Sequence, residues 1–92
     1  MKSVRKAAVL GSGSWGTALA TVVAQHAETV SLWGRDEALC RDIRERHRNT
    51  RYLPGIELDP KIRATTELRE CVEGAEVVIV GLPTKALAAV LE

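Results

Sequence analysis

Three glycines, Gly11, Gly13 and Gly16, lie between a short apolar run and a segment with helical periodicity. The apolar run covers residues 7–10, and the helical pattern continues from residue 17 to residue 26. A strand, a glycine-rich turn and a helix in this order are the context that a dinucleotide-binding turn requires. This short segment therefore predicts the start of a nucleotide-binding α/β domain.

Each glycine of the turn has its own predicted role. Gly11 lets the chain turn tightly off the strand, at backbone angles that a side chain disfavours. Gly13 leaves room for a pyrophosphate beside the backbone, and Gly16 lets the helix pack closely on the strand. The phosphates then meet free N–H groups at the positive end of the helix dipole. The cofactor-binding residues predicted in the turn are Gly11, Ser12, Gly13, Ser14, Trp15 and Gly16.

Strand patterns recur along the chain, at residues 6–10, 29–33, 61–64 and 76–80. The last is an unbroken apolar run, typical of a strand that is buried on both faces. Helices alternate with these strands, so the connections are expected to be right-handed crossovers in a parallel sheet. We predict an α/β fold: a Rossmann-type sheet with flanking helices and strand order 3-2-1-4, which is part of a doubly wound fold.

The helices are predicted from their caps and apolar spacing. The first covers residues 14–26, the second follows the N-cap Asp36 to about residue 48, and a short third runs from the N-cap Thr66 to Gly74. A fourth begins at Thr84, and residues 49–58 are expected to form a loop. The residues predicted to face the core are Ala18, Leu19, Val22, Val23 and His26, then Leu39, Cys40, Ile43 and His47, then Leu68, Cys71 and Val72.

Composition excludes several classes of function. The formal net charge of +1 gives no reason to expect binding to nucleic acid or to a membrane. No apolar run approaches the roughly 20 residues of a membrane span and no signal peptide is visible, so we expect a cytoplasmic protein. The two cysteines lack metal or redox spacing and are interpreted as reduced packing residues, and no metal site is predicted. Arginines 41, 44, 48 and 51 alternate with acidic residues, which favours a solvated, ion-paired face.

Arg35 follows the second predicted strand, where NAD-specific sheets carry an acidic residue that binds the ribose hydroxyls. The nearest acid, Asp36, is better used as the helix cap. A guanidinium can bind a 2′-phosphate bidentately and stack on adenine, whereas the alternative is a solvated arginine in a turn. We therefore expect NADP(H) to be the preferred cofactor, with NAD(H) possible.

Four segments appear in a characteristic order: residues 13–20 (GSWGTALA), 32–36 (LWGRD), Asn49 with 52–55 (YLPG), and 80–83 (VGLP). Together they resemble bacterial NAD(P)-dependent glycerol-3-phosphate dehydrogenase over essentially the whole chain. The resemblance implies reduction of dihydroxyacetone phosphate to sn-glycerol 3-phosphate, a precursor of phospholipids. It also implies that residues 1–92 are the N-terminal part of a dinucleotide-binding domain, with a helical C-terminal substrate domain absent from this chain.

The same resemblance implies roles for individual residues. Ser14 and Trp15 match a cofactor-contacting pair, for which packing is the alternative at Trp15. Arg35 matches a basic residue against the adenosine ribose, and Tyr52 matches a loop aromatic near the cofactor. Pro83 belongs to the motif near the nicotinamide end, where the family usually has Ala or Val before the proline motif and this chain has Gly81-Leu82.

The family's catalytic lysines fall in motifs that this chain does not contain, and Lys85 is not one of them. No catalytic residue is therefore predicted, and the chain alone is expected to be inactive and to meet triose phosphate only as part of the full-length enzyme. An unpartnered edge on the last strand predicts self-association of the chain. Two alternatives remain: the cofactor domain of another two-domain hydroxy-acid dehydrogenase, and a stand-alone dinucleotide-sensing module.

Overall fold

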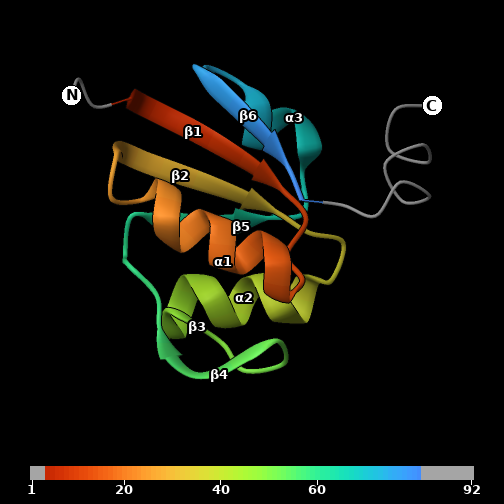
Figure 1. Cartoon of the computed structure of the whole chain (residues 1–92). Helices are drawn as coiled ribbons and strands as arrows, with labels where there is room; N and C mark the ends of the chain where they lie inside the picture. The colour runs from red at the N-terminus through yellow and green to blue at the C-terminus, as the bar shows by residue number, and fades with distance from the viewer. Residues whose placement is uncertain (1–3, 82–92) are drawn as a thin grey trace.

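A four-stranded parallel sheet forms the centre of the molecule in a computed structural model that describes residues 4–81 (Figure 1). Its strands are β1 (Val4–Leu10), β2 (Ala27–Trp33), β5 (Ile62–Thr65) and β6 (Val77–Val80). They lie in the order β5-β2-β1-β6, and each neighbouring pair is parallel. Counted within the sheet alone, this is the predicted order 3-2-1-4. The labels differ because β3 and β4 lie between in the chain and form a separate two-stranded sheet.

Helices cover both faces of the sheet, and each face has its own apolar cluster. On one face, α1 (Ser14–Val23) and α2 (Glu37–Arg46) pack on side chains such as Val9 of β1. On the other face, α3 (Leu68–Val72) packs on Leu10. Side chains of consecutive strand residues point to opposite faces, so β1 alone supplies both clusters. Within residues 4–81, no helix is long and apolar enough to cross a membrane.

Helix α1 buries only part of the predicted face: Leu19 and Val23 are partly buried and pack against the core cluster. Gly16, Thr17 and Ala20 are buried, whereas Val22 is 57% exposed and His26 lies beyond the helix on the surface. The three most buried residues of the helix were not among those predicted to face the core. Their small side chains let the start of the helix approach the end of β1 closely.

Helix α2 begins as predicted at Asp36, whose Oδ1 accepts a hydrogen bond from the Leu39 N–H at 3.2 Å. Leu39, Cys40 and Ile43 are buried, as their spacing predicts. The helix ends at His47, a half-buried residue in the left-handed region with φ 56°.

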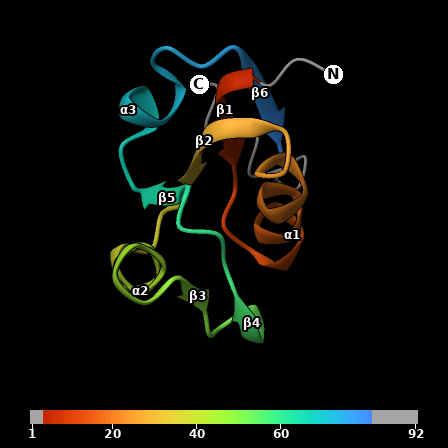
Figure 2. The same cartoon turned by 90° about the vertical axis from the view of Figure 1, so that its left-hand side faces the viewer.

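Two local predictions are wrong. The expected loop at residues 49–58 contains an antiparallel hairpin of β3 (Arg48–Asn49) and β4 (Leu53–Glu57), which Figures 1 and 2 place beside α2 and away from the main sheet. Thr66 is not the cap of α3, because Glu67 occupies the N-cap position and the Thr66 hydroxyl instead donates to Glu37 at 3.3 Å. Gly74 does follow the helix end, with φ +75°.

Strand β6 is not buried on both faces, contrary to the prediction from its apolar run. Val77, Val78 and Val80 are 40–47% exposed. Within the described residues β6 pairs with β1 alone, so one of its edges has no strand beside it. The expected helix from Thr84 lies outside the described residues.

Both cysteines are free and fully buried, as interpreted from the sequence. Cys40 lies in the α1–α2 cluster and Cys71 in the α3 cluster. Burial raises the pKa of the Cys40 thiol, and it raises the pKa of Cys71 to about 11. Both are therefore protonated packing residues at neutral pH.

Candidate functional site

The glycine-rich turn connects β1 to α1 and lies at the carboxyl end of the sheet. Gly11 has φ +117°, in the region that favours glycine, and its N–H donates to the Trp33 carbonyl at 2.8 Å. A Cβ at Gly16 would overlap the Gly11 carbonyl oxygen and lie 2.7 Å from its carbon. The predicted structural roles of these two glycines, a tight turn and close packing, are both confirmed.

Gly13 faces open space, since a Cβ at this position would meet no atom within 4 Å. Gly13 is also the N-cap residue of α1, which has no side-chain cap and no acidic residue in its first turn. An unfilled helix start attracts anions, because its N–H groups and its dipole both favour negative charge. The turn therefore has both the backbone N–H donors of the helix start and open space beside Gly13.

Asn49 is the residue that holds this turn to the hairpin, and sequence reasoning assigned it no role. Its side chain is fully buried. The amide Nδ2 donates to the Ser12 carbonyl at 3.0 Å and to the Thr17 hydroxyl at 2.8 Å, while its Oδ1 accepts the Tyr52 N–H at 3.1 Å. The signal available in the sequence was an asparagine shortly after the helix, ahead of the Pro54-Gly55 pair.

A pocket of about 220 Å³ opens between the turn, the end of β2 and the hairpin. Its lining residues are Gly11, Ser12, Gly13, Trp33, Gly34, Arg35, Asp36, Leu39, Arg51 and Tyr52. Five of the nine predicted site residues meet here: Gly11, Ser12, Gly13, Arg35 and Tyr52.

The other four predicted site residues do not line this pocket. Ser14 and Trp15 are exposed on the first turn of α1, and Gly16 is buried beneath them. At 68% exposure, Trp15 is not part of the core formed by the described residues. Pro83 lies outside the described residues.

Arg35 lies at the pocket with its guanidinium carbon 5.9 Å from the centre of the Trp33 ring. This distance is at the outer limit of a cation–π contact. Trp33 itself is buried, and its Nε1 donates to the Thr66 carbonyl at 3.0 Å. Trp33 is therefore a core residue at the rim of the pocket.

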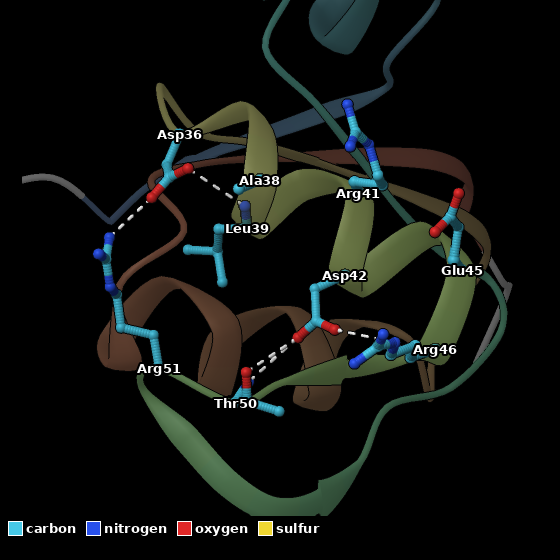
Figure 3. Close-up of a pocket in the computed structure, with 9 residues that line it drawn as sticks. All are labelled: Asp36, Ala38, Leu39, Arg41, Asp42, Glu45, Arg46, Thr50 and Arg51. Carbon is cyan, nitrogen blue, oxygen red and sulfur yellow. Dashed lines mark hydrogen bonds and ion pairs between the residues drawn. The ribbon is translucent and has the colours of Figure 1, made fainter.

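A larger groove of about 370 Å³ runs along the outer side of α2 (Figure 3). Arginines and carboxylates alternate along it. Arg51 forms an ion pair with Asp36 at 2.7 Å, and Arg46 forms one with Asp42 at 3.7 Å. Next to it, a hydrogen bond from Arg44 lowers the pKa of Glu37. The mixed charge gives no preference for a phosphate. Of the four arginines predicted to form an ion-paired face, Arg44 and Arg51 pair with acidic side chains, so this prediction is confirmed in part.

No group of three or more histidines, cysteines or carboxylates within residues 4–81 is arranged to hold a metal ion. The site therefore offers backbone donors, two arginines, one carboxylate and two aromatic side chains around one pocket.

A parallel sheet, a helix that starts uncapped at a glycine turn, and a pocket beside the end of the second sheet strand together define a Rossmann-type dinucleotide-binding domain. Residues 6–92 match the family model described as NAD-dependent glycerol-3-phosphate dehydrogenase N-terminus. The chain belongs to this family, which confirms the resemblance found in its sequence motifs.

Similar proteins agree with this assignment. The NAD(P)+ glycerol-3-phosphate dehydrogenase of Stenotrophomonas maltophilia (strain R551-3) is 54% identical over 81 residues, which cover 88% of this chain and 24% of that relative. The enzyme of the same name from Bacillus pumilus is 45% identical over 89 residues, which cover 97% of this chain and 26% of that relative. This chain therefore spans about a quarter of the length of these relatives.

Solved structures of similar proteins share the fold. The glycerol-3-phosphate dehydrogenase of Plasmodium falciparum superposes with a TM-score of 0.88 at 33% identity, over 97% of this chain and 28% of that chain. The Saccharomyces cerevisiae enzyme gives a TM-score of 0.86 at 32% identity, over 94% of this chain and 28% of that chain. The alternative of another hydroxy-acid dehydrogenase is not favoured.

Proposed function

We propose that this chain binds NADP(H) or NAD(H) at the glycine-rich turn, as the cofactor-binding part of an NAD(P)-dependent glycerol-3-phosphate dehydrogenase. In the complete enzyme, hydride passes between the nicotinamide and C2 of dihydroxyacetone phosphate, which gives sn-glycerol 3-phosphate for phospholipid synthesis. The substrate site and the catalytic groups belong to the rest of the protein. We place the protein in the cytoplasm, where its two buried free thiols stay reduced.

The observation that carries this proposal is the uncapped start of α1 at Gly13. The pyrophosphate occupies the open space beside Gly13 and accepts hydrogen bonds from the first N–H groups of α1. Ser14 and Trp15 flank it from the exposed first turn, and Tyr52 faces it from the hairpin. Pro83 remains a predicted contact near the nicotinamide.

The test of the site is Gly13→Val, measured by calorimetric titration with NADPH and NADH. Gly13 has φ −71°, which valine can adopt, and a Cβ at this position meets no atom within 4 Å, so we expect the variant to fold. The valine side chain then fills the space that the pyrophosphate needs, and binding is lost while the circular dichroism spectrum is kept. Unchanged affinity in a folded variant contradicts the site.

The preference for NADP(H) rests on Arg35, which is exposed at the adenosine end of the pocket. Arg35→Asp replaces attraction to the 2′-phosphate by repulsion and weakens NADPH more than NADH. A charge-assisted hydrogen bond contributes about 1.5–3 kcal/mol, and solvent exposure places the expected loss near the lower end, about tenfold. Equal weakening of both cofactors shows that Arg35 does not read the 2′-phosphate.

Self-association of the chain follows from the edge of β6. Three β-branched side chains of this strand are exposed, and the Glu76 carboxylate, which could guard the edge, accepts the Arg5 N–H at 2.6 Å. Unprotected edges pair with other chains. Sedimentation at several concentrations is expected to show dimers that dissociate on dilution, and a strict monomer contradicts this proposal.

A further inference from the structure

The Asp36–Arg51 ion pair stands at the cofactor pocket and has no role in the function proposed above. We propose that Arg51 determines how well this pocket accepts a 2′-phosphate, because it neutralises the carboxylate of Asp36. The inference rests on the proposed cofactor site and adds a specificity-determining residue to it.

Asp36 is the one carboxylate among the described residues that line the pocket. Both of its oxygens are engaged, as Figure 3 shows. Oδ1 accepts the Leu39 N–H at 3.2 Å, and Oδ2 accepts a hydrogen bond from Arg51 Nη1 at 2.7 Å. The first contact caps α2, and the second brings an arginine from the hairpin to the pocket.

The position of Asp36 explains why its charge matters. It lies three residues beyond Trp33, the last residue of β2. At the end of this strand, an acidic side chain accepts hydrogen bonds from the ribose hydroxyls of NAD, and its negative charge repels the 2′-phosphate of NADP. With Arg35 and Arg51 opposing one carboxylate, the pocket carries a formal charge of +1, and without Arg51 this charge falls to zero.

Arg51 is held in place by the residues on both sides of it. Asn49 is clamped to the glycine turn and accepts the Tyr52 N–H at 3.1 Å, while the Thr50 hydroxyl donates to Asp42 at 3.1 Å. The backbone that carries Arg51 is therefore fixed before any ligand binds. A positioned guanidinium neutralises a carboxylate more effectively than a mobile one, since less side-chain entropy is lost.

The test compares two probes that differ in the 2′-phosphate alone: 2′,5′-ADP and 5′-AMP. Calorimetry measures their binding to the chain and to Arg51→Met, Asp36→Asn and the double variant. Asparagine caps a helix as well as aspartate does, so α2 is preserved. The pair is partly exposed, and such pairs contribute up to about 1 kcal/mol, which is about five-fold in affinity.

Arg51→Met is expected to weaken 2′,5′-ADP about five-fold and to leave 5′-AMP within about twofold. The double variant recovers the affinity for 2′,5′-ADP, because neither charge remains, and Arg51→Lys retains most of it. The effect of Arg51→Met decreases as salt is raised, since the Debye length falls from about 10 Å at about 0.1 M to about 3 Å at about 1 M.

Two results overturn the inference while the proposed function stands. One is equal weakening of both probes by Arg51→Met, which indicates a general structural role. The other is a double variant that binds 2′,5′-ADP no better than Arg51→Met, which indicates direct contact between Arg51 and the phosphate. If the unchanged chain binds neither probe, the proposed function fails and the inference fails with it.

Discussion

Removal of the Asn49 side chain is expected to uncouple the hairpin from the glycine-rich turn. In Asn49→Ala, the donors to the Ser12 carbonyl and the Thr17 hydroxyl disappear, and so does the acceptor for the Tyr52 N–H. The Ser12 carbonyl keeps one partner, because the Thr17 hydroxyl donates to it at 3.1 Å. The Tyr52 N–H, which lies nearer the surface, can bond to water.

The magnitude follows from these contacts. Each of the three lost hydrogen bonds contributes about 1 kcal/mol net, and the cavity adds little for so small a side chain. We expect a loss of about 2–3 kcal/mol in the free energy of unfolding. A chain of this length has roughly 5–14 kcal/mol in total at about 0.05–0.15 kcal/mol per residue, so the variant remains folded with its stability clearly reduced.

Urea unfolding, followed by the fluorescence of the buried Trp33, measures this loss. The neighbouring variant Thr50→Ala is the control, since Thr50 is exposed and its change is expected to stay within about 0.5 kcal/mol. An Asn49→Ala variant as stable as this control refutes the reasoning. Affinity for NADPH is expected to fall as well, because both walls of the pocket depend on Asn49.

Three further predictions follow. Gly16→Ala is expected to cost about 3 kcal/mol or more by overlap with the Gly11 carbonyl. Gly13→Ala meets no atom and is expected to cost about 1 kcal/mol or less, since alanine is a poorer N-cap than glycine; equal thermal midpoints of the two variants contradict this. Burial raises the pKa of Cys71 from 9.0 to about 11, so its contribution to stability is complete below about pH 9 and falls by up to roughly 3 kcal/mol as the pH rises to about 11. Urea unfolding across that range checks it, and a Cys71→Ala variant with the same alkaline loss refutes it. With dihydroxyacetone phosphate and NADPH, the chain alone is expected to show no turnover above background, and measurable turnover by purified chain contradicts the assignment of catalysis to the rest of the protein.

The parts of the fold that could be predicted are those set by local pattern. The four sheet strands fall within two residues of their predicted starts and ends, because each alternates with a helix and carries an apolar run. The Asp36 cap was also predictable, since it depends on residues four positions apart or fewer. Strand order followed from the doubly wound pattern that the alternating strands and helices indicate.

The parts that could not be predicted depend on contacts between distant residues. The burial of Gly16 in α1 depends on its close approach to Gly11, and no periodicity encodes that distance. From the sequence, Arg51 was interpreted as part of a solvated stripe of arginines. Its position at the pocket could not be predicted, because it depends on the hairpin and on the hydrogen bonds of Asn49 to the glycine turn. Sequence spacing identified the glycine turn and Arg35. The wall of the pocket formed by the hairpin could be identified only from the folded structure.

The most direct test of the account is an NMR titration of the ¹⁵N-labelled chain with NADPH. A small chain of 92 residues allows each backbone amide to be followed separately. We expect saturable shifts at the amides of residues 11–16 and at those of Arg35, Arg51 and Tyr52, because the pyrophosphate binds at the start of α1 and the adenosine ribose binds beside the hairpin. Shifts confined to the charged groove along α2, or no shifts at all, would contradict the claim that this turn is the cofactor site.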